Sequence, residues 1–70
     1  MRASSLYLKL ELLRREITQL EIADEAQVDR TLVSHVIAGR RRNADVEAVI
    51  ARRLGVPVDT LFEPRRARVA

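Results

Sequence analysis

Four polar residues at helical spacing are the part of this 70-residue sequence best suited to bind another molecule. They would share one face of a helix over residues 30–38, because residues three and four apart lie side by side on a helix. An arginine fork, two hydroxyls and an imidazole can donate and accept hydrogen bonds, and this face carries no Glu or Lys. The pattern indicates a contact surface. Its residues are Arg30, Thr31, Ser34 and His35.

The same composition argues against catalysis and metal binding. His35 is the only histidine, and the sequence contains no cysteine. Zinc sites and Ser-His-Asp catalysis need several such groups in one place. We therefore expect neither an enzyme nor a metal protein, and we expect no cofactor. No apolar run approaches the roughly 20 residues of a membrane span, so we expect no membrane partner.

Basic charge is concentrated in the second half of the chain. The net charge is +3, with −1 carried by residues 1–35 and +4 by residues 36–70. Every basic residue except Lys9 is an arginine, and the planar guanidinium suits phosphate better than an ammonium does. A polyanionic partner is one interpretation of this bias, and a GC-rich genome is the other. Three consecutive arginines, Arg40 to Arg42, form the densest cluster.

The contact residues would be positioned by an all-α fold, a compact bundle of about five short helices. A capping box at Thr18 and Glu21 predicts a helix of about eight residues. Asp29 and Asn43 are good N-caps for two more helices, and glycines follow both of them. The expected ranges are about 6–17, 19–26, 30–38, 44–54 and 58–62. The folded domain is expected at 6–63, between a flexible N-terminus (1–5) and a flexible basic tail (64–70).

The first of these segments admits two interpretations. Alternating leucines over residues 6–12 fit a half-buried strand. At about 100° per residue, however, four apolar side chains fall within one narrow stripe that would face the core of a helical bundle. The stripe consists of Leu6, Leu10, Leu13 and Ile17.

A helix in this segment also predicts a surface for self-association. Leu8 and Leu12 would lie opposite the stripe and stay exposed to water in a monomer. Leu61 and Phe62, together with the tail, form the alternative surface. The sequence does not choose between these two.

Residues 18–39, TQLEIADEAQVDRTLVSHVIAG, resemble the helix-turn-helix of the lambda-repressor-like (Cro/XRE-type) DNA-binding domains. The resemblance continues through VEAVIARRLGVPVDTLF, residues 46–62, and covers roughly residues 10–62. Its specific elements include Ala23 at the helix crossing and Val28 after the turn. Two residues depart from the pattern, because Gln27 and Glu16 stand where the family usually or often has glycine. Either Gln27 tolerates a left-handed backbone or the turn differs slightly.

This resemblance implies a sequence-specific DNA-binding transcriptional regulator. The helix over residues 30–38 would lie in the major groove while the preceding helix crosses the phosphate backbone. The implied base contacts are the four polar residues introduced above. The implied phosphate contacts are Gln19, Arg40, Arg41, Arg42 and Asn43.

Such a small module reads few base pairs, so we expect a homodimer on a palindromic operator in double-stranded DNA, with half-sites about 34 Å apart. Repression by occluding a promoter is the expected mechanism, in the cytoplasm and at the nucleoid, as in small phage regulators. The alternative hypothesis is a protein-interaction module, such as an antitoxin that masks a partner protein.

Overall fold

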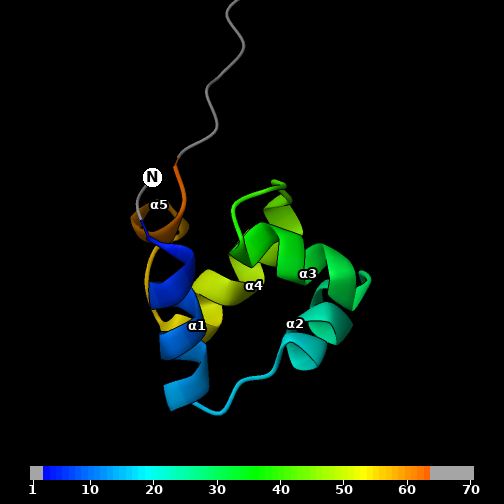
Figure 1. Cartoon of the computed structure of the whole chain (residues 1–70), viewed down its shortest axis with the longest axis horizontal. Coiled ribbons are helices and arrows are strands. Elements are labelled where there is room, and N and C mark those ends of the chain that lie inside the picture. Colours follow the sequence, from blue (N-terminus) through cyan, green and yellow to red (C-terminus); the bar gives the residue numbers. More distant parts are fainter. Residues whose placement is uncertain (1–2, 64–70) are drawn as a thin grey trace, which may run out of the picture.

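The computed structural model describes residues 3–63, and this part of the chain contains five α-helices and no β-strand (Figure 1). The fold is therefore all-α, and residues 6–12 are helical. The predicted basic tail lies outside the described residues. The helices are α1 (Ser5–Arg14), α2 (Gln19–Ala26), α3 (Arg30–Ile37), α4 (Ala44–Leu54) and α5 (Val58–Leu61).

Helix α4 is the centre of the bundle (Figure 1). It contacts α2, α3 and α5, while α3 also contacts α1 and α2. The inward faces expected for α2, α3 and α4 are confirmed, because their apolar side chains form one buried cluster. The cluster includes Ile22, Ala23, Val33, Val36, Ile37, Val46, Val49, Ile50 and Leu54.

The helix starts follow local hydrogen bonding. The capping box is present, because the Glu21 N–H donates to Thr18 Oγ1 (3.1 Å) and the Thr18 N–H donates to Glu21 Oε1 (2.9 Å). Asn43 caps α4 by accepting the N–H of Val46 (3.0 Å). Asp29 occupies the N-cap position of α3, but its side chain makes no capping hydrogen bond.

The four longest helices end in the same way. One residue adopts a positive φ, and the N–H of the next residue donates to the carbonyl five residues back, which is the Schellman motif. The left-handed residues are Glu16 (φ 57°), Gln27 (59°), Gly39 (83°) and Gly55 (74°). The closing bonds are Ile17 to Leu12 (2.9 Å), Val28 to Ala23 (3.0 Å), Arg40 to His35 (2.9 Å) and Val56 to Ala51 (3.1 Å). Gln27 therefore does tolerate the left-handed backbone.

The face of α1 that packs on the core differs from the prediction. Leu8 and Leu12 are buried (1% and 4% exposed), so they are not the exposed pair that we expected. The predicted inward leucines face solvent instead. The physical reason is the helix end: α1 stops at Arg14, and the chain reverses at Glu16, so Ile17 is not part of the helical stripe. The exposed leucines are Leu6, Leu10 and Leu13.

The folded part also begins earlier than predicted. Ala3 is buried, and its N–H donates to the carbonyl of Leu61 (3.1 Å). Ser4 accepts the N–H of Tyr7 (3.0 Å) and is the N-cap of α1. Residues 3–5 thus belong to the domain, and the buried Leu61 is not available as a dimer surface, while Phe62 is half-buried. A four-residue helix such as α5 is stable only through these tertiary contacts.

Candidate nucleic-acid interface

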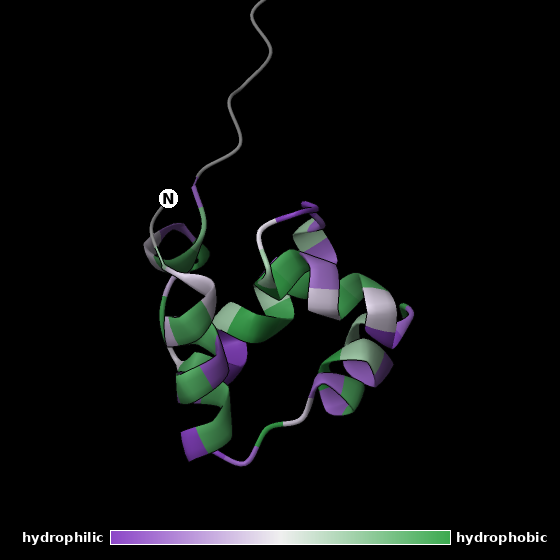
Figure 2. Cartoon of the chain, in the orientation of Figure 1, coloured by the Kyte–Doolittle hydropathy of each residue, from purple (hydrophilic) through white to green (hydrophobic). Residues whose placement is uncertain are grey.

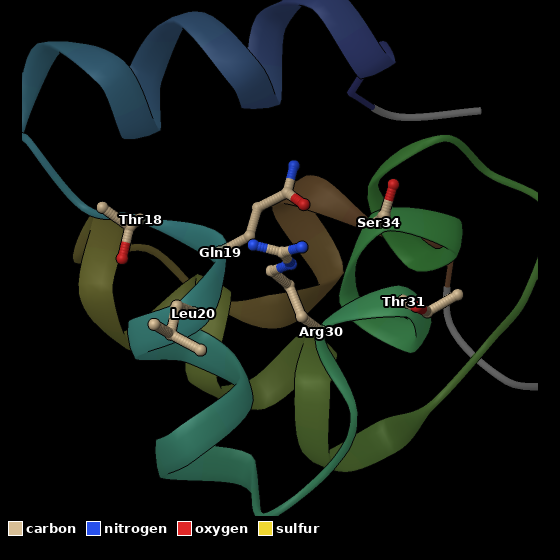
Figure 3. Close-up of a pocket in the computed structure, with 6 residues that line it drawn as sticks. All are labelled: Thr18, Gln19, Leu20, Arg30, Thr31 and Ser34. Carbon is tan, nitrogen blue, oxygen red and sulfur yellow. The ribbon is translucent and has the colours of Figure 1, made fainter.

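A shallow hollow of about 680 Å³ lies between the start of α2 and the outer face of α3 (Figure 3). Figure 3 shows the side chains of Gln19 and Arg30 extending over it from the two helices. The lining residues include one cation and no carboxylate. They are Thr18, Gln19, Leu20, Arg30, Thr31 and Ser34.

The α2 side of the hollow presents backbone donors. The capping box uses the N–H groups of Thr18 and Glu21. The N–H groups of Gln19 and Leu20 lie between them and have no partner within residues 3–63. Because the first N–H groups of a helix carry partial positive charge, this corner favours an anion.

The α3 side of the hollow presents the predicted contact face. Arg30, Thr31 and Ser34 are exposed, while the opposite face of α3 is buried in the core. His35 is half-buried and does not line the hollow. Its carbonyl accepts the N–H groups of Arg40 (2.9 Å) and Arg41 (3.3 Å). The structure therefore gathers three of the four predicted base-contact residues beside Gln19 and leaves His35 at the edge.

The arginines of residues 3–63 divide into two groups. Those outside the α3 region are paired with carboxylates: Arg14 and Arg15 with Glu11, and Arg52 and Arg53 with Glu25, where Arg53 Nε lies 2.9 Å from Glu25 Oε1. Arg42 is paired with Glu47. The other group has no ion pair or side-chain hydrogen bond within the described residues. It consists of Arg30, Arg40 and Arg41, all of which are exposed.

Arg42 and Asn43, both predicted phosphate contacts, are engaged inside the fold. Arg42 Nε donates to Glu47 Oε2 (2.7 Å), and Arg42 Nη2 donates to Glu47 Oε1 (3.2 Å) and to the Glu63 carbonyl (2.6 Å). The hydrogen bond with Glu47 holds the pKa of Arg42 above its usual value. Asn43 donates its N–H to Glu47 Oε2 (3.2 Å) and caps α4 with its side chain.

Sequence reasoning missed three residues of this region. Glu47 is 3% exposed and holds the residues before α4 in place, and its signal was a carboxylate beside the inward positions 46 and 50. Leu20 is 55% exposed and lines the hollow with Thr18. The signal for both was their place in the first turn of α2, next to Gln19.

No protein-family model matches this chain, and no curated protein or solved structure matches it significantly. Residues 3–63 contain no group of three or more His, Cys, Asp or Glu side chains able to hold a metal ion. None of the helices in this range is both long enough and apolar enough to span a membrane.

Proposed function

We propose that this protein is a sequence-specific DNA-binding transcriptional regulator that acts as a repressor. The observation that carries the proposal is the division of the arginines. The three without a carboxylate partner all belong to α3 or directly follow it, beside a hollow lined by no carboxylate. A surface of uncompensated arginines next to free helix N–H groups suits the phosphates of nucleic acid.

In this proposal α2 and α3 act as a helix-turn-helix, with α3 in the major groove. Arg30 forks onto O6 and N7 of a guanine, and Thr31 offers a hydroxyl and a methyl group, the latter suited to thymine. Ser34 reaches a base edge, and His35 contributes from the edge of the face. The exposed Leu20 adds apolar contact beside the backbone.

Phosphate contacts come from the flanks of α3. The side chain and N–H of Gln19 bind one phosphate at the start of α2, and Arg40 and Arg41 bind phosphates beyond the end of α3. Arg42 and Asn43 contribute less than the sequence pattern predicts, because Glu47 already holds them.

The protein acts as a homodimer on a palindromic operator and represses by occluding a promoter, within the cytoplasm at the nucleoid. No catalysis, metal or cofactor is part of this proposal. It agrees with the resemblance of residues 18–39 to the lambda-repressor-like domains. A second candidate function is an antitoxin-like module that masks a partner protein, and the exposed leucines of α1 favour it.

The proposal is tested by selecting binding sites from a genomic fragment library in moderate salt. We expect an enriched inverted repeat. Arg30→Ala should weaken binding to it by about 10- to 100-fold and relax one base position, as expected for loss of a bidentate guanine contact. Arg52→Ala is the matched control, because Arg52 is paired with Glu25 on α4. If no repeat is enriched, or if both variants lose affinity equally, the protein does not read DNA through α3.

A further inference from the structure

Helix α1 carries an exposed apolar stripe, here called the α1 stripe, formed by Leu6 (65% exposed), Leu10 (49%) and Leu13 (72%). Tyr7, 47% exposed, lies beside it. Figure 2 shows hydrophobic residues along most of α1, including the side turned away from the other helices. The four side chains expose on the order of 450 Å² per copy, within the roughly 300–600 Å² of the largest and often functional apolar patch on a monomer.

We propose that the α1 stripe is a homodimer interface, in which the α1 helices of two copies pack antiparallel about a two-fold axis near Leu10. The inference deepens the dimeric part of the proposed function and rests on it only for the use of the dimer at a palindromic operator. The contact itself forms without DNA.

The spacing of the α1 stripe makes it self-complementary. A two-fold contact requires that residue i meets residue j and that j meets i. In an antiparallel pair centred near Leu10, that residue lies opposite Leu10 of the second copy. Leu6 of each copy then lies opposite Leu13 of the other, so all three leucines meet leucines. Helices packed at about 8–10 Å leave no room for water between such pairs.

The charges beside the stripe favour the antiparallel direction. Tyr7 and Arg14 lie on the same flank of α1, two helical turns apart. A parallel pair would place Arg14 beside Arg14 of the second copy, where the two cations repel each other. The antiparallel pair places Arg14 of each copy beside the ring of Tyr7 of the other, within reach of a cation–π contact. Arg14 is free to make it, because 72% of its side chain is exposed.

The area sets the strength of the dimer. Two copies of the stripe bury about 900 Å², below the roughly 1,200 Å² of the smallest stable specific interfaces. We therefore expect a concentration-dependent dimer in the micromolar range. Two heads bound to neighbouring half-sites would raise their effective concentration and stabilise the same contact.

Single cysteines test both the contact and its direction, because the natural sequence contains none. Under mild oxidation Leu10→Cys should form a disulfide-linked dimer, since its two copies lie opposite each other. Neither Leu6→Cys nor Leu13→Cys should form one alone, but a mixture of the two should form the mixed dimer. Leu20→Cys is the control, because Leu20 is also exposed but lies on α2.

Sedimentation equilibrium without DNA supplies the second measurement. The wild-type protein and Leu20→Glu should dimerise with rising concentration, whereas Leu10→Glu should remain monomeric with unchanged helical circular dichroism. Three results would overturn the inference: a wild type that stays monomeric, cross-linking at Leu10→Cys no faster than at Leu20→Cys, or homodimers of Leu6→Cys and Leu13→Cys alone. A monomer that still selects a DNA half-site overturns this inference only. A dimer that selects no sequence overturns only the proposed function.

Discussion

Arg41 and Arg42 are adjacent in the sequence but have different surroundings. Arg41 is exposed and has no side-chain partner within residues 3–63. Arg42 forms two hydrogen bonds with the buried Glu47 and one with the Glu63 carbonyl. One arginine is therefore available to a phosphate, while its neighbour ties the start of α4 to the segment after α5.

Replacing each of these arginines with alanine should separate the two roles. Arg41→Ala should lower the slope of log K against log salt by about 0.9 and leave the free energy of unfolding within about 0.5 kcal/mol. Arg42→Ala should lower the free energy of unfolding by about 2 kcal/mol, because a buried carboxylate loses a charged partner. Fluorescence anisotropy at several salt concentrations and urea unfolding measure these quantities. Equal effects of the two substitutions on either quantity would contradict the division of roles.

At this scale the sequence predicted the contact face but not which arginines are free. The face of α3 follows from local periodicity, since its apolar residues must point inward. Arg53 is bound by Glu25, 28 positions earlier in the chain. Such pairings depend on how α2 packs against α4, and no local pattern contains that information.

At the scale of the element, α2 ends on a non-glycine residue in the left-handed region, Gln27 (φ 59°). The left-handed conformation costs an ordinary L-residue roughly 1–2 kcal/mol, a penalty that glycine does not pay. We expect Gln27→Gly to raise the free energy of unfolding by about 1 kcal/mol and the melting temperature by about 4–8 °C. Gln27→Ala, which removes the side chain but keeps the Cβ, should not stabilise the protein. Urea and thermal unfolding of both variants decide this, and an equal gain in both would rule out backbone strain as the cause.

The helix boundaries were predictable because they are fixed within a few residues by caps and stop signals. The orientation of α1 was not. Both of its faces carry leucines, so periodicity alone cannot tell which face meets α3 and which meets solvent. Extending the helical period to Ile17 added a residue that belongs to the following turn, and this favoured the wrong face.

The whole molecule should lose stability in acid through carboxylates that accept hydrogen bonds in the native state. The Thr18 N–H lowers the pKa of Glu21 below its ordinary 4.5, and Arg15 does the same for Glu11. A carboxylate whose pKa is lower in the folded protein contributes stability above its unfolded pKa, and that contribution disappears as the pH falls through the folded pKa.

Glu21→Gln isolates one of these contributions, because glutamine can still complete the capping box. We expect the wild type to be more stable than Glu21→Gln at pH 7, and we expect this difference to vanish near pH 3, below the lowered pKa. Urea unfolding at a series of pH values measures it. A difference that stays constant across the series would show that the charge of Glu21 has no part in it.

Arg40 follows the left-handed residue at the end of α3, and this position distinguishes α3 from the other three long helices. Ile17, Val28 and Val56 hold the same position after α1, α2 and α4, and each packs its side chain against the core. Arg40 is exposed, as are all side chains of residues 38–41, between the buried Ile37 and the Glu47-bound Arg42. These four positions can therefore accept new side chains through mutation without disturbing the interior. Evolution could retune this corner for a different target while the rest of the scaffold stays the same.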